Sequence, residues 1–168
     1  MNRDPLPPML QTCSLHSLLI CVSKVLTRSG FGDVQILDRR SSKQKSRFGG
    51  HELMCETTLG IYPLKIVVKV IQDDVRTRMV DELAGTVMRT RADMGLLITP
   101  FNVSERIINA QDAHRPLHLE FIDGNRLARL MRCSGVGVRP KGEVDYAFFT
   151  ELDEVADRLF EFIRKERA

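Results

Sequence analysis

Hydrophobic and polar positions along the 168-residue chain follow two different periods. Apolar residues recur every three or four positions in three segments, Met9 to Ser29, Asp74 to Arg91 and Glu151 to Lys165, which predicts a helix in each. Short apolar runs between these segments predict strands, and the most apolar run spans Leu64 to Ile71. Further strands are predicted at about 34–37, 51–57, 95–99, 117–122 and 144–149, and further helices at about 102–112 and 123–131.

The order of the predicted elements indicates an α/β fold. A helix is followed by three strands and then by alternating helices and strands, which favours right-handed crossovers and a mixed central sheet flanked by helices. The chain is long enough for one domain with a sizeable core. We expect a flexible lead-in over residues 1–8, which hold three prolines, and a single domain over 9–168. Within that domain we expect a first helix at 9–29, a core at 30–132 and a C-terminal β/α tail at 133–168.

Lys69 interrupts the most apolar predicted strand. An ammonium group is rare inside such a run unless a partner or a function requires it. Glu52 lies on the preceding predicted strand, and a hairpin would bring both side chains to one end of the sheet. A carboxylate that binds a divalent cation beside a lysine that orients a water is typical of metal-assisted phosphodiester hydrolysis. On spacing alone, a purely structural ion pair, or a lysine that extends to the strand end, is the favoured interpretation of the same residues.

A basic run lies between the first two predicted strands. Five of its nine residues are basic and none is a large apolar residue. The run is either a solvated loop or a loop that contacts nucleic-acid phosphates. Its basic residues are Arg39, Arg40, Lys43, Lys45 and Arg47.

Composition narrows the function classes only moderately. A net charge of +3 and a pI of about 8.8 permit nucleic-acid binding without requiring it. The four cysteines form no CxxC pair and have no clustered histidine, so neither a zinc site nor a redox motif is indicated. The sequence shows no P-loop, dinucleotide fingerprint, GxSxG motif, signal peptide or membrane span. We therefore expect a cytoplasmic protein in a reducing compartment with no membrane partner.

Short motifs follow one another between Gly30 and about Val155. They are Gly30-Phe31 with Val34, Gly49-Gly50-His51-Glu52, Leu59-Gly60 through Lys69, Gly85, Ala92 to Gly95, Leu96-Leu97-Ile98-Thr99, Phe121-Ile122-Asp123-Gly124, Leu127-Ala128-Arg129-Leu130-Met131, Gly135-Val136-Gly137-Val138 and Leu152-Asp153. In this order and with nearly gapless spacing they resemble the catalytic domain of the Mrr-like type IV restriction endonucleases, within the PD-(D/E)xK nuclease superfamily. The resemblance implies a restriction-endonuclease-like αβββαβ core and a role in defence.

The resemblance also implies a catalytic apparatus, which this chain matches only in part. Glu52 takes the place of the family's metal-binding aspartate, and Lys69 matches the lysine that orients the attacking water. Val67 stands where the family has a glutamine or glutamate, and a valine binds no metal. We therefore predict a protein that acts on or binds DNA with impaired or lost cleavage. The alternative is an active Mg²⁺-dependent DNA endonuclease in which Glu52 holds the cation.

The expected partners follow from the same resemblance. The first expected partner is DNA, bound through the basic run and through the cleft that holds the active site in the family. A homodimer is expected if both strands are cut. The family's N-terminal winged-helix domain has no counterpart in residues 1–29, so a protein partner that supplies DNA recognition is a further expectation. If neither cleavage nor DNA binding occurs, a protein partner or an assembly role remains.

Overall fold

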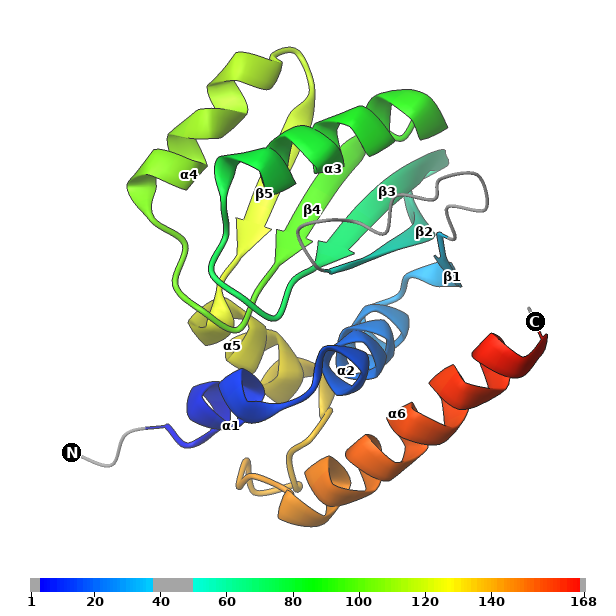
Figure 1. The fold of residues 1–168 in the computed structure, drawn as a ribbon, viewed down its shortest axis with the longest axis vertical. Coiled ribbons are helices and arrows are strands. Elements are labelled where there is room, and N and C mark those ends of the chain that lie inside the picture. Colours follow the sequence, from blue (N-terminus) through cyan, green and yellow to red (C-terminus); the bar gives the residue numbers. More distant parts are fainter. Residues whose placement is uncertain (1–3, 38–49, 167–168) are drawn as a thin grey trace.

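The computed structural model describes residues 4–37 and 50–166. Two helices and three strands come first, helices then alternate with strands, and two helices end the chain (Figure 1). The elements are α1 (Leu6–Thr12), α2 (Leu15–Arg28), β1 (Gly32–Ile36), β2 (His51–Leu59), β3 (Tyr62–Val70), α3 (Thr77–Thr90), β4 (Met94–Ile98), α4 (Glu105–Ala110), a 3-10 turn η1 (Gln111–His114), β5 (His118–Ile122), α5 (Gly124–Ser134) and α6 (Tyr146–Glu166).

The five strands form one mixed sheet in the order β1-β2-β3-β4-β5. Strands β1, β2 and β3 are antiparallel, whereas β4 and β5 run parallel to β3. Helix α3 makes the crossover from β3 to β4, and α4 with η1 makes the crossover from β4 to β5. The predicted mixed sheet flanked by helices is therefore confirmed.

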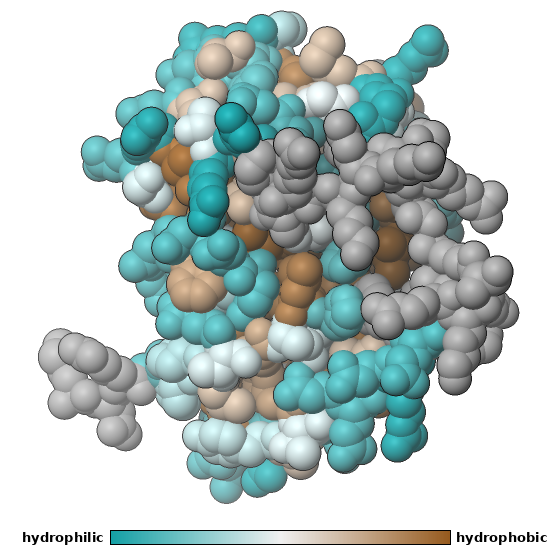
Figure 2. All heavy atoms as spheres, in the orientation of Figure 1, coloured by the Kyte–Doolittle hydropathy of each residue, from teal (hydrophilic) through white to brown (hydrophobic). Residues whose placement is uncertain are grey.

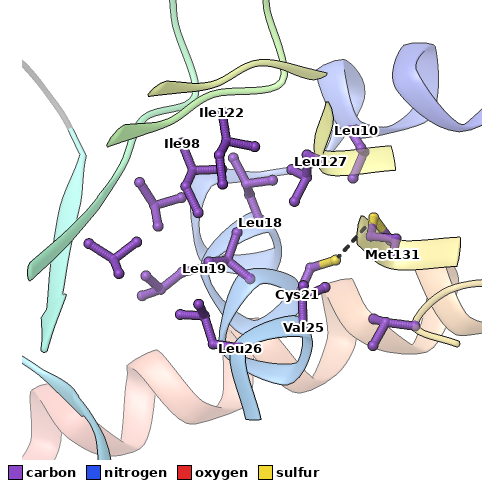
Figure 3. Close-up of a cluster of buried hydrophobic side chains, with 14 of the residues drawn as sticks. Leu10, Leu18, Leu19, Cys21, Val25, Leu26, Ile98, Ile122, Leu127 and Met131 are labelled. Atoms are coloured by element: carbon purple, nitrogen blue, oxygen red, sulfur yellow. Dashed lines mark hydrogen bonds between the residues drawn. The ribbon is translucent and has the colours of Figure 1, made fainter. Parts of the chain in front are cut away.

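Helices cover both faces of the sheet. Helices α3 and α4 lie on one side, and α1, α2, α5 and α6 lie on the other (Figure 1). The second side holds the larger apolar core, in which Leu18, Leu19 and Leu26 of α2 pack near Ile98, Ile122 and α5 (Figure 3). Because alternate residues of a strand point to opposite faces, β3 contributes to both cores.

The structure corrects three boundaries. The single helix predicted at 9–29 is two helices, and Ser14 caps the second by accepting a hydrogen bond from the Ser17 backbone N–H. Helix α1 begins at the buried Leu6, inside the stretch predicted as a flexible lead-in. The strand predicted at 144–149 is wrong, because α6 begins at Tyr146 and only one isolated bridge, Val138 to Val144, forms there.

Hydrophilic side chains dominate the upper and lower parts of the face shown in Figure 2, and apolar atoms reach the surface mainly between them. No helix within residues 4–37 and 50–166 has the length and apolar character needed to cross a bilayer.

Candidate active site

Glu52 and Lys69 lie directly opposite each other in the antiparallel β2–β3 ladder. Directly opposed residues point to the same face of a sheet, and this face is the one beneath α3. The Lys69 ammonium Nζ lies 3.4 Å from Glu52 Oε1. The hairpin therefore brings the two predicted catalytic residues together.

Helix α3 adds a second carboxylate to this pair. Glu82 Oε2 lies 2.9 Å from Lys69 Nζ, closer than the Glu52 oxygen. The helix approaches the sheet closely above the next strand, where Gly95 has no room for a Cβ atom against Leu83 and Val87. That close approach allows a glutamate side chain on α3 to reach the strand below it.

Thr86 links Glu52 to the same helix. Its hydroxyl Oγ1 lies 2.9 Å from Glu52 Oε2 and 3.1 Å from Oε1, and also 3.1 Å from the Glu82 carbonyl oxygen one turn earlier. Arg89 Nη2 donates to Thr86 Oγ1 over 3.0 Å. We call Glu52, Lys69, Glu82 and Thr86 the polar cluster; the exposed Arg89 lies at its edge.

The polar cluster is almost entirely removed from solvent. Lys69 is 1% exposed, Glu52 8% and Thr86 0%, whereas the Glu82 side chain is 21% exposed. Buried charges persist only with close partners of opposite charge and with hydrogen bonds. Here one ammonium lies between two carboxylates, and the Arg89 guanidinium lies at the edge of the cluster.

Val67, which the sequence resemblance matches to the family's glutamine or glutamate, lies on the same face as Lys69. It is fully buried and belongs to the apolar group formed by α3 residues such as Val80, Leu83 and Val87. Position 67 is therefore packed against α3 and contributes no polar atom to the cluster.

Sequence reasoning identified two members of the cluster and missed two. Glu82 and Thr86 are one helical turn apart on the face of α3 that also carries Met79 and Leu83. Polar residues at this spacing beside an apolar stripe were the available signal. The strand lysine shows that a partner is needed but does not show which helix residue supplies it.

The remaining predicted site residues lie elsewhere. Arg39, Arg40, Lys43, Lys45 and Arg47 lie outside the described residues. His51 precedes Glu52 but lies against His16 of α2, with 5.6 Å between ring centroids. Burial, with smaller contributions from His16 and Lys69, lowers the pKa of His51 below its ordinary value. The lowered pKa favours the neutral form of the ring.

Comparison with known proteins agrees with this architecture. The restriction endonuclease family model Mrr_cat matches residues 10–131, which is most of the chain. The chain belongs to the Mrr_cat restriction endonuclease family. The match includes both sheet residues of the cluster and all of α3. No curated protein matches the sequence.

Two solved structures resemble this Mrr_cat domain. The DNA modification-dependent restriction endonuclease AspBHI aligns with a TM-score of 0.56 and 14% identity over 96% of this chain and 41% of AspBHI. The restriction endonuclease MspJI, in complex with a 27-mer oligonucleotide, aligns with a TM-score of 0.47 and 16% identity over 84% of this chain and 31% of MspJI. The AspBHI alignment shows the restriction-endonuclease fold, and the domain spans less than half of either relative.

The donor atoms of the polar cluster suit a hard divalent cation. Mg²⁺ prefers oxygen ligands, and one or two carboxylates commonly hold it together with waters and substrate phosphate oxygens. Glu52 and Glu82 provide two carboxylates around one ammonium. Within the described residues no group of three or more His, Cys, Asp or Glu side chains could hold a metal ion. Such a group is not required, because phosphate and water complete the coordination of Mg²⁺.

Proposed function

We propose that this Mrr_cat domain is a Mg²⁺-dependent DNA endonuclease that hydrolyses phosphodiester bonds at the polar cluster. The observation that supports this proposal is the contact between the paired strand residues, Glu52 Oε1 and Lys69 Nζ, at 3.4 Å. A carboxylate and an ammonium on one face supply the two functions that the reaction needs, a cation ligand and a positive group near the reacting water.

In this proposal the chain's own residues orient the attacking water and stabilise negative charge during hydrolysis. The oxygen of a water forms a bond to phosphorus and the water gives up one proton, while the phosphorus–oxygen bond to the leaving sugar oxygen breaks and that oxygen takes up one proton. Lys69 is held by Glu52 and Glu82, so its ammonium is positioned to orient the water and to stabilise negative charge on the phosphoryl oxygens. A bound Mg²⁺ would supply Lewis-acid polarisation of the phosphate.

A second candidate function is DNA binding without cleavage. Val67 supports it, because the family's polar side chain is replaced by one that is fully buried against α3. The low exposure of Glu52 and Lys69 also suits a structural ion pair. In this case the domain would bind DNA through the basic run at 39–47, and a protein partner or a second copy would complete recognition.

Plasmid cleavage separates the two candidates. We would incubate supercoiled plasmid, methylated and unmethylated, with the wild-type chain and with Lys69→Met in Mg²⁺ or Mn²⁺. We expect the wild-type chain to nick or linearise DNA and Lys69→Met to lose at least 100-fold of that rate, as for other losses of electrostatic stabilisation. Comparison of the two plasmids shows whether base modification matters.

The alternative gives the opposite pattern. If the wild-type chain does not cleave in either metal but binds DNA in a salt-sensitive manner, the endonuclease proposal is wrong and the binding proposal holds. Neutralising Lys43, Lys45 and Arg47 should then weaken binding and reduce its dependence on salt concentration.

A further inference from the structure

Helix α3 contributes two polar side chains to the face of the sheet that carries Lys69. Glu82 and Thr86 lie one turn apart, and both contact strand residues: Glu82 contacts Lys69 at 2.9 Å, and Thr86 contacts Glu52 at 2.9 Å. The Glu52 and Glu82 carboxylates thus contact the same Lys69 nitrogen, one from the strand and one from the helix.

We propose, on the basis of the proposed function, that Glu82 supplies from α3 the second carboxylate that position 67 lacks. Glu82 is then a catalytic residue that, with Glu52, holds the divalent cation beside Lys69. The nuclease apparatus is complete in this chain, and one of its carboxylates comes from the crossover helix instead of from β3.

The packing around position 67 explains why the helix is the source. A side chain at 67 points beneath α3, where Val67 is fully buried among apolar residues. Glu82 lies on the helix above the same strand, 13 positions after Lys69 in the chain. A carboxylate can therefore reach the Lys69 ammonium from above without placing a polar atom in the apolar contact between β3 and α3.

Charge and exposure give Glu82 a role that Glu52 alone cannot fill. The Glu52 and Glu82 carboxylates both contact the Lys69 ammonium, and carboxylate oxygens are ligands that a hard divalent cation prefers. Glu52 is 8% exposed and its two oxygens already accept from Lys69 and Thr86. The Glu82 side chain is 21% exposed and is therefore the carboxylate that a cation arriving from solvent reaches first.

A simpler role for Glu82 would be to position Lys69. In that role Glu82 would act only through the ammonium, and cation affinity would not depend on it. As a cation ligand, Glu82 must instead determine that affinity directly. Cation binding therefore distinguishes the two roles, whereas loss of cleavage alone does not.

The test measures cation binding to the full chain without DNA. Mn²⁺ binding by isothermal titration calorimetry, with Tb³⁺ luminescence as a second probe, would be compared for the wild-type chain, Glu82→Gln and Asp81→Asn. Asp81 is the matched control because it removes the same charge from the same helix but contacts His114 at 2.8 Å, away from Lys69. Circular dichroism and thermal melting of each variant would establish that it folds.

We expect Glu82→Gln to weaken Mn²⁺ binding about 10- to 100-fold and to raise the Mg²⁺ concentration needed for half-maximal cleavage, and Asp81→Asn to change either quantity less than about twofold. Unchanged Mn²⁺ affinity in a folded Glu82→Gln chain would overturn the inference, even if cleavage falls. Absence of Mn²⁺ binding to the wild-type chain would overturn it as well.

Plasmid cleavage tests the proposed endonuclease function separately from the ligand assignment. If the wild-type chain binds Mn²⁺ through Glu82 but cuts no plasmid, the endonuclease proposal fails and the ligand assignment stands. If the wild-type chain cuts plasmid and Glu82→Gln cuts with the same Mg²⁺ dependence, the endonuclease proposal stands and the ligand assignment fails.

Discussion

The two faces of the sheet are built from the same strands but differ in chemistry. Strand β3 sends Ile66, Val68 and Val70 into the core beneath α2, where they belong to the larger apolar cluster. The alternate residues Val67 and Lys69 point beneath α3, where an apolar group adjoins the polar cluster. One strand thus contributes packing on one side and candidate catalytic chemistry on the other.

The two faces differ in which substitutions they tolerate. Apolar cores accept many combinations of side chains if volume and pattern are kept. A buried charged network tolerates little, because removing one member leaves the others without compensation. We therefore expect substitutions of comparable size on the two faces to differ in how much stability they remove. We also expect them to differ in how strongly the stability of each variant responds to divalent cations.

The largest expected effect is that of Lys69→Met on stability without divalent cations. Methionine keeps the length of the side chain but removes the charge, so two neighbouring carboxylates lose the ammonium that both contact. Breaking such a buried pair costs about 3–5 kcal/mol. Urea unfolding with a chelator present would measure this loss, and added Ca²⁺ should restore part of it because the cation binds only the folded state.

Val68→Ala is the control for that measurement on the opposite face. It removes two buried methyl groups beside α2 and should cost about 2–3 kcal/mol through lost burial and a residual cavity. Its stability should respond to Ca²⁺ as the wild-type chain does. If Lys69→Met responds no more strongly to Ca²⁺ than Val68→Ala, the contrast between the faces is wrong.

Val67→Ala tests whether the apolar part of the α3 face behaves like the core beneath α2. Because Val67 is fully buried among α3 side chains, we expect a loss of about 2 kcal/mol in the free energy of unfolding. Mn²⁺ affinity should be unchanged, since the side chain provides no ligand. A fall in Mn²⁺ affinity comparable to that of Glu82→Gln would show that packing, and not the carboxylates, controls the site.

Much of this architecture could be predicted from the sequence, for identifiable reasons. Period-two and helical patterns located all five strands and both crossovers, and the helix predicted from residue 123 is α5, which Asp123 caps by accepting from the Arg126 backbone N–H. The hairpin pairing of Glu52 with Lys69 also followed from the pattern. Residues 144–149 were misassigned because Val144 and the aromatic residues after it have strand propensity, whereas packing of α6 against α2 favours a helix.

The helix contribution to the site was not predictable in the same way. Glu82 and Thr86 follow β3 by more than ten residues, and only the height and rotation of α3 above the sheet bring Glu82 to Lys69 and Thr86 to Glu52. The height and rotation of α3 depend on tertiary packing. One example is Gly95, whose lack of a side chain allows α3 to approach the sheet closely. The prediction of impaired cleavage considered two strand positions, Val67 and the longer Glu52, and did not include a carboxylate from a helix.

Thr86→Val should give the smallest of these effects. Valine keeps the shape of threonine but removes the hydroxyl that links Arg89 to Glu52, so Glu52 loses one buried hydrogen bond and keeps its contact with Lys69. We expect a loss of about 1.5 kcal/mol in stability, the lower end of values for hydrogen bonds to charged groups. Cleavage should fall about tenfold, as is typical when a residue that orients a cation ligand is lost.

Thr90→Val is the matched control, because Thr90 Oγ1 donates to the Thr86 backbone carbonyl and not to a side chain of the cluster. Equal plasmid cleavage rates for the two variants would show that the Thr86 hydroxyl does not orient Glu52.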